Sequence, residues 1–188
     1  MTEFALCLPL LTTLIFVGLE NVNYAFAAQK VGDVATLSAD AISRIRVGIS
    51  EDDVNETLAG IAKLGDTLRF TANGRIIVSS VQPELDSAGN VTGQKIRWQR
   101  CYGGMTSAAS SYGTQGQSLG VAGMGPAGRK VAAIANSELI FVETVYTYQP
   151  LININLFSGP RTMRMLAGMS VRERTANNLV ASGTASPC

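Results

Sequence analysis

The architecture of this chain follows from the stretch FALCLPLLTTLIFVGLENVNYAFAA, residues 4–28. These 25 residues contain one formal charge, at Glu20. As an α-helix the stretch is roughly 37 Å long, which exceeds the roughly 30 Å of a bilayer's hydrocarbon core. Pro9 lies near the start of the run, where a helix tolerates proline. The stretch therefore predicts a transmembrane helix.

A cleaved signal peptide is the alternative interpretation, because Ala25-Phe26-Ala27 has the small-x-small form of a cleavage site. Two features favour a retained helix. The flank before the run is acidic, at Glu3, where a signal peptide carries positive charge. Helical spacing also continues beyond the run, so that one helix is expected to extend to about Arg46. The residues that show this spacing are Val31, Val34, Leu37, Ala41 and Ile45.

The basic residues around the run are distributed asymmetrically. Lys30, Arg44 and Arg46 follow it, and no lysine or arginine precedes it. By the positive-inside rule this distribution places the rest of the chain in the cytoplasm, unless a basic segment precedes Met1. The orientation therefore stays open at this stage.

Composition favours a structural protein over an enzyme. The chain has no histidine, which removes the commonest general base and the commonest zinc ligand. Its Gly-rich segment GVAGMGPAGRK, residues 120–130, matches neither of the usual phosphate-binding fingerprints. The net charge of +1 gives no electrostatic basis for nucleic-acid binding. We therefore expect no catalytic residue, no cofactor, no metal site and no nucleic-acid partner.

The pattern divides the chain into an N-terminal helix at residues 1–48 and an α+β domain at residues 49–188. Gly48 closes the first unit, and Ser50 is expected to cap a second helix that has acidic residues in its first turn. This acidic cluster is interpreted as a helix start and not as a metal site. The helix is expected to end at Gly65. Its apolar side consists of Val54, Leu58, Ile61 and Ala62.

Strands are predicted after this helix. Asn73-Gly74 lies between two β-rich runs and predicts a hairpin turn. A second turn is expected within residues 86–93, followed by a strand in which Ile96 and Trp98 alternate with polar residues. Trp98 is interpreted as an anchor of the core.

A long surface loop is predicted for residues 103–128, which are rich in Gly, Ser and Ala. The strongest central strand is SELIFVETVYTYQP, residues 137–150, and a final strand at residues 162–175 is expected to be bulged near Gly168. The predicted antiparallel sheet has one buried face, covered by the capped helix. We therefore expect the body to fold without the first helix.

Three cysteines are present. Cys7 lies in the apolar run and is interpreted as a small hydrophobe. Cys101 and Cys188 allow one disulfide, which is favourable only outside the cytosol. Two cysteines do not establish a bond, so paired and free thiols are both open.

The segments EFALCLPLL, GLENVNYAFAAQKV and FVETVYTYQPLI resemble the TadE-type pseudopilins of the tight-adherence (Tad/Flp) pilus machinery. The resemblance covers the first 45 residues strongly and residues 141–174 moderately. It implies assembly or intramembrane roles for Glu3, the aromatic Phe4, the helix proline Pro9 and the later acid Glu20. In that family a basic leader ending in glycine precedes the glutamate, whereas only Met1 and Thr2 precede Glu3 here. Either Met1 is an internal start or the chain is inserted without cleavage.

The resemblance implies a minor pilin or pseudopilin, anchored in the inner membrane by a single pass with its C-terminal domain periplasmic or extracellular. Its partners would be other pilin or pseudopilin subunits and the Tad secretion machinery, and it could enter a surface pilus. Glu3 would pair with the amino-terminal ammonium of a neighbouring subunit and set the register of the helices. The alternative function is a membrane-anchored or secreted binding module whose loop at residues 103–128 contacts a ligand.

Overall fold

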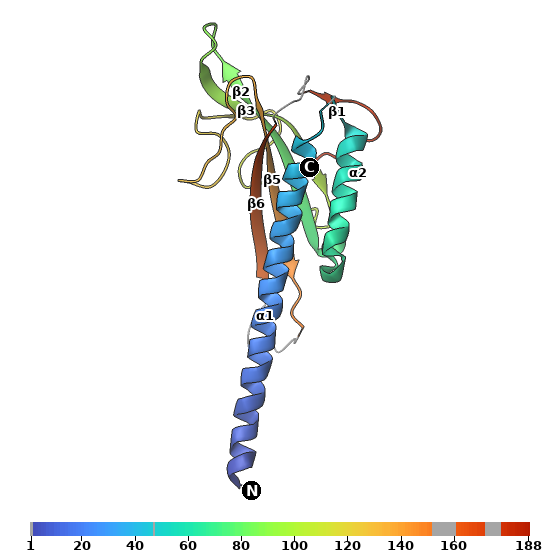
Figure 1. Cartoon of the computed structure of the whole chain (residues 1–188), viewed down its shortest axis with the longest axis vertical. Helices are drawn as coiled ribbons and strands as arrows, with labels where there is room; N and C mark the ends of the chain where they lie inside the picture. The colour runs from blue at the N-terminus through green and yellow to red at the C-terminus, as the bar shows by residue number, and fades with distance from the viewer. Residues whose placement is uncertain (1, 47, 152–160, 172–177) are drawn as a thin grey trace.

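The protein is an α+β fold in which one long helix runs along an antiparallel sheet and projects beyond it (Figure 1). The computed structural model describes residues 2–46, 48–151, 161–171 and 178–188, without the side chains of residues 2, 3 and 6. The elements in chain order are α1 (Thr2–Ser43), β1 (Ile49–Ser50), α2 (Glu51–Ala62), the 3-10 helix η1 (Lys63–Leu68), α3 (Phe70–Asn73), β2 (Gly74–Leu85), β3 (Val91–Tyr102), β4 (Ser118–Leu119), β5 (Glu138–Tyr148), β6 (Arg161–Val171) and β7 (Leu179–Val180).

Helix α1 has two halves with different surroundings. Its N-terminal half extends away from the body, and its C-terminal half lies against the sheet (Figure 1). The helix ends at Ser43 and not near Arg46, because its last turn tightens and Gly48, at φ +48°, turns the chain. The buried apolar residues of the C-terminal half are Ala27, Val31, Val34, Ala35, Ala39 and Ile42.

The predicted cap of α2 is confirmed. The Ser50 hydroxyl accepts from the Asp53 backbone N–H at 3.2 Å, and the Asp53 carboxylate accepts from the Ser50 backbone N–H at 3.0 Å. Glu51 in the same turn is buried and pairs with Arg100 of β3, which fastens the helix start to the sheet. The expected end at Gly65 is wrong, since the chain continues as η1 through that residue.

The hairpin predicted at Asn73-Gly74 is wrong. Residues 70–73 form the short helix α3, and β2 starts at Gly74, so the dipeptide joins a helix to a strand. Phe70 explains the outcome, because it is fully buried and stacks on Tyr146 with ring centroids 6.0 Å apart. Tertiary packing of this ring outweighs the local turn preference.

The main sheet has the order β4-β3-β2-β5-β6. The turn predicted within residues 86–93 is confirmed as the connection of the β2–β3 hairpin, where the Asp86 carboxylate accepts from the backbone of Ala88 and Asn90. The expected internal strand is also confirmed, because β5 pairs with β2 on one side and β6 on the other. No bulge occurs at Gly168, which pairs in register with Phe141. The part of the predicted final strand beyond Val171 includes residues 172–175, which lie outside the described residues.

A β-bulge separates Ile96 from Trp98. Trp98 pairs with Ser80 and Ile96 pairs with Val81, so two residues of β2 span three of β3. The extra residue, Arg97, reverses the alternation, and the two apolar side chains enter different core clusters. Trp98 is buried as predicted, but Ile96 lies on the opposite face.

Both faces of the sheet are therefore covered, contrary to the single buried face that we expected. Helices α1 and α2 cover one face. Residues 103–137 cover the other, with Ala108, Met124 and Ala133 buried. Gln94 of β3 donates to Ala133 O at 2.9 Å and accepts from Ala133 N at 3.1 Å. The segment predicted as a surface loop is irregular, but it is fastened to the sheet.

The C-terminal tail is fastened to the body. Cys188 forms a disulfide with Cys101 of β3, with Cα atoms 5.0 Å apart. The Ser186 carbonyl accepts from Cys101 N at 2.9 Å, and its hydroxyl donates to Asn55 of α2 at 2.6 Å. Strand β7 pairs with β1 in parallel. The tail thus connects β3, α2 and β1.

The core crosses the boundary that we placed between residues 48 and 49. Val31, Val34 and Ile42 of α1 belong to the same cluster as Leu58 of α2 and Trp98 of β3. The expectation that the body folds without the first helix does not fit this packing, because removal of α1 exposes the part of the sheet face that α1 covers.

Candidate assembly site

The N-terminal half of α1 presents apolar side chains to its surroundings on every side. Successive helical residues are about 100° apart, so the four residues Leu14–Val17 cover the full circumference, and all four are exposed. Further exposed apolar residues of this half are Phe4, Leu8, Leu10, Leu11, Leu19, Val22 and Phe26. We call the exposed part of α1, residues 4–26, the apolar shaft. Among the described residues, α1 is the one helix long and apolar enough to cross a membrane.

Three of the residues singled out by the sequence lie at or near the start of this shaft. Glu3 is part of α1, although its side chain lies outside what the structure describes. Phe4 is 71% exposed. Pro9 lies inside the helix, which continues through it. In this structure Phe4 and Pro9 have no packing role in the body and are available to an external partner.

Glu20 lies at the other end of the shaft and contacts the body. Its Oε1 accepts from the Tyr148 hydroxyl at 2.7 Å, and its Oε2 accepts from the backbone N–H of Leu151 at 3.2 Å. Asn23, one helical turn further along, donates to the same hydroxyl at 2.6 Å. We call Glu20, Asn23, Tyr24, Tyr148 and Leu151 the Glu20 joint. It connects the helix to the end of β5 at the level where the body begins.

Aromatic contacts complete the Glu20 joint. The rings of Tyr24 and Tyr148 pack edge to face with centroids 5.2 Å apart. The guanidinium of Arg161, the first residue of β6, lies 5.7 Å from the Tyr24 ring centroid. Arg161 pairs with Tyr148 across the strands, so β5 and β6 reach the helix together.

The Tyr148 hydroxyl is a hydrogen-bond donor at neutral pH. Burial and then the hydrogen bond to the Glu20 carboxylate raise the pKa of Tyr148 to about 12. The proton thus stays on the phenol, and the carboxylate accepts a hydrogen bond from the phenol hydroxyl. The interaction combines an ionised acceptor with a neutral donor, which is stronger than a pair of neutral groups.

Sequence reasoning singled out Glu20 but missed Asn23, Tyr24, Tyr148 and Arg161. One signal was present: Glu20, Asn23 and Tyr24 have the i, i+3, i+4 spacing that places side chains on one helix face. Three polar or amphipathic residues on one face of an apolar helix indicate a contact there. The strand residues had no comparable signal, because their approach to the helix depends on the tertiary fold.

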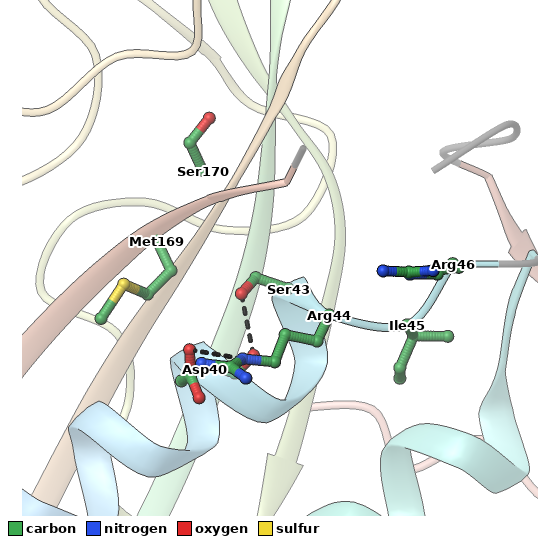
Figure 2. Close-up of a pocket in the computed structure, with 7 residues that line it drawn as sticks. All are labelled: Asp40, Ser43, Arg44, Ile45, Arg46, Met169 and Ser170. Atoms are coloured by element: carbon green, nitrogen blue, oxygen red, sulfur yellow. Dashed lines mark hydrogen bonds and ion pairs between the residues drawn. The ribbon is translucent and has the colours of Figure 1, made fainter. Parts of the chain in front are cut away.

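A pocket of about 530 Å³ lies at the opposite end of α1 from the shaft (Figure 2). Asp40 and Arg44 on its wall form an ion pair of 2.9 Å along the helix. The pocket is also lined by Ser43, Ile45, Arg46, Met169 and Ser170. This wall offers a mixed polar and apolar surface, and none of the sequence-predicted site residues lies in it.

The fold and these surfaces define an α+β protein with an apolar helical shaft. Hydrogen bonds to Glu20 attach this shaft to the body. Comparison with protein-family models, with curated protein sequences and with solved structures finds no match to this chain. The residues of the shaft and of the joint are therefore the features of this chain that point to its function.

Proposed function

We propose that the chain is a structural or assembly subunit of a Tad/Flp-type pilus, a minor pilin or pseudopilin. In this proposal the shaft anchors it in the inner membrane and the body is periplasmic or extracellular. The observation that carries the proposal is the apolar shaft, which is exposed on all sides and yet continuous with a helix that forms part of the core. Such a shaft requires an apolar environment that the chain itself does not supply.

Lipid and neighbouring helices both meet that requirement. Association of helices within a membrane depends on packing and hydrogen bonds and gains little from hydrophobicity, since lipid tails are equally apolar. An all-round apolar helix can therefore pass from lipid into contact with other subunits without exposing its surface to water. This exchange is what assembly of a membrane-held subunit into a fibre requires.

Glu3 gives the assembly its register in this proposal. A carboxylate in hydrocarbon is costly and favours a partner. The resemblance to TadE-type pseudopilins supplies one, the amino-terminal ammonium of a neighbouring subunit. A pair of this kind forms only when two helices are correctly aligned, which is the specificity role that a buried polar group can fill.

The length of the shaft also supports the anchoring. From Thr2 to Glu20 there are 19 residues, which as a helix measure about 28 Å, close to the roughly 30 Å hydrocarbon thickness. With Thr2 at one boundary of the hydrocarbon, Glu3 lies just inside it and Glu20 comes to the opposite boundary. We therefore place Glu20 at the membrane edge, where its carboxylate serves the helix–body joint.

The joint favours a retained helix over a cleaved signal peptide. Cleavage after Ala27 would remove Glu20, Asn23 and Tyr24, all of which contact Tyr148. Ala27 itself is fully buried against the core.

The test replaces the Glu3 carboxylate with leucine, in the cell that makes the protein. We expect Glu3→Leu to insert in the membrane at the wild-type level and to reduce the number of surface pili. Asp33→Leu is the matched control, since Asp33 is an exposed carboxylate on the same helix but beyond the shaft. Normal piliation by Glu3→Leu, or equal loss in both variants, would contradict the register role.

A further inference from the structure

We propose that the end of the body beside the Glu20 joint rests in the phospholipid headgroup layer, and that the joint holds this end of the body at that level. This surface, which we call the foot, consists of Gln149, Pro150, Leu151 and Arg161. The inference rests on the membrane anchoring in the proposed function, and it adds a second contact with the membrane, made by the body.

The level of the foot follows from its contacts with α1. The backbone N–H of Leu151 donates to Glu20 Oε2 at 3.2 Å, so the foot and Glu20 lie at the same height along the helix. The shaft up to Glu20 is about as long as the hydrocarbon is thick. A bilayer that takes in the shaft as far as Glu20 therefore brings its headgroups to the foot.

The chemistry of the foot suits a headgroup layer. Leu151 is 70% exposed and apolar, while Gln149 and Arg161 are exposed and polar. Tyr24 is half-buried beside them, with the Arg161 guanidinium against its ring. Tyrosine is enriched at membrane interfaces, and arginine binds phosphate through a planar set of donors. Together these side chains offer apolar, aromatic and cationic groups to one layer.

Phospholipid is favoured over a protein partner because the foot is continuous with the shaft. Tyr24 belongs both to α1 and to the joint, and Val22 and Phe26 on the neighbouring turns are exposed. No other described element separates the foot from the point where the shaft leaves the body (Figure 1). Among the described residues of the body, the foot is therefore the part next to a membrane that surrounds the shaft.

The Glu20 joint holds the foot at the level of Glu20 along the helix. Two hydrogen bonds to one carboxylate, with the edge-to-face tyrosine pair beside them, hold β5 against α1 where the helix becomes unsupported. Without them the hydrogen bond from Asn23 to the Tyr148 hydroxyl is the polar contact that is left between the helix and the end of β5 among the described residues. Glu20 is thus a positioning residue for the foot.

The experiment uses the full chain in lipid nanodiscs that contain phosphatidylcholine, phosphatidylglycerol and no protein besides the scaffold. In a Cys7→Ser background, an environment-sensitive fluorophore is attached at Leu151→Cys or Gln149→Cys. Lipids with a spin label at the headgroup quench a fluorophore that lies in the headgroup layer, so the degree of quenching reports how deep each labelled position lies. Ser87→Cys in the β2–β3 turn is the exposed control, and Leu14→Cys reports whether the shaft is inserted.

We expect headgroup-labelled lipids to quench most of the fluorescence at positions 149 and 151. They should quench position 87 no more than a fluorophore in free solution. Position 14 should be quenched by lipids that carry the spin label deep in the acyl chain. Adding Glu20→Leu should decrease quenching at position 151 and leave position 14 unchanged. Quenching at position 14 without quenching at 149 or 151 would overturn the foot and leave the anchor intact. No quenching at position 14 would overturn both the anchor and the foot.

Discussion

The hydroxyl of Tyr148, at the end of β5, donates a 2.7 Å hydrogen bond to Oε1 of Glu20 on α1, although the two residues are 128 positions apart in the sequence. This contact joins the exposed shaft to the folded body. A helix that was only a membrane anchor would need no such attachment. The contact holds the end of β5 against α1 at the point where the shaft leaves the body.

A double-mutant cycle tests the strength of this attachment. Glu20→Leu and Tyr148→Phe should each lower the free energy of unfolding, and the double variant should lose less than the sum of the two. For a hydrogen bond to a charged group we expect a coupling of about 1.5–3 kcal/mol. Thermal unfolding in detergent measures it. Additive losses would show that the two side chains do not interact. As a control, Asp33→Asn should leave the free energy of unfolding within about 0.5 kcal/mol of the wild-type value.

The second prediction concerns the role of α1 in the core. A fragment that starts at Ile49 lacks Val31, Val34 and Ile42, whose burial contributes about 1.5–3 kcal/mol each. Their sum is comparable to the whole stability of a domain, about 5–15 kcal/mol. We therefore expect this fragment to be molten or aggregated.

A fragment that starts at Glu20 is the matched control for α1. It retains the joint and the buried half of the helix, so it should be soluble and should unfold cooperatively in calorimetry. Cooperative unfolding of the Ile49 fragment would show that the helix adds little to the core, as the sequence alone suggested.

The third prediction concerns the disulfide. Cys101 and Cys188 are 87 residues apart, and closing a loop of that length contributes on the order of 4 kcal/mol in the chain-entropy model. Cys188→Ser should therefore lower the midpoint of thermal unfolding. Alkylation of protein taken from its native compartment, under non-reducing conditions, should label only Cys7. Labelling of all three thiols would contradict both the bond and an exported body.

The fourth prediction compares two glycines. A Cβ at Gly74 would lie 2.6 Å from the Phe70 ring, which is fully buried and has little freedom to move. Gly74→Ala should destabilise the protein by about 1–3 kcal/mol, the usual cost of overpacking. Gly60 on the exposed side of α2 has open space, so Gly60→Ala should stabilise by about 0.5–1 kcal/mol. Equal effects in chemical denaturation would contradict the α3–β2 junction described here.

Local signals in the sequence predicted the helix start at Ser50, the turn after Leu85 and the internal strand β5 correctly. Each of these depends on residues close together in the chain. The errors at Asn73-Gly74 and at Ile96 have a different origin. Phe70 stacks on Tyr146 from another strand, and the bulge at Arg97 appears only when β3 is aligned with β2. Neither relationship is visible in a local pattern.

The candidate site also has one part that local sequence signals predict and another that depends on tertiary packing. The shaft could be predicted, because a run of 25 mostly apolar residues with one formal charge forms a signal by itself. The joint could be predicted only from its helix side, through the spacing of Glu20, Asn23 and Tyr24. Tyr148 and Leu151 come to Glu20 through the packing of β5 on α1, which local patterns do not contain.

The most direct test of the account is site-specific photo-crosslinking in cells that assemble the fibre. A photoreactive amino acid at Leu11 on the shaft is compared with one at Ser87 on the body. We expect Leu11 to form adducts with pilus subunits that have an apolar N-terminal helix, and Glu3→Leu to abolish them. Adducts with lipid alone at Leu11, or subunit adducts that persist unchanged in Glu3→Leu, would contradict assembly through the shaft.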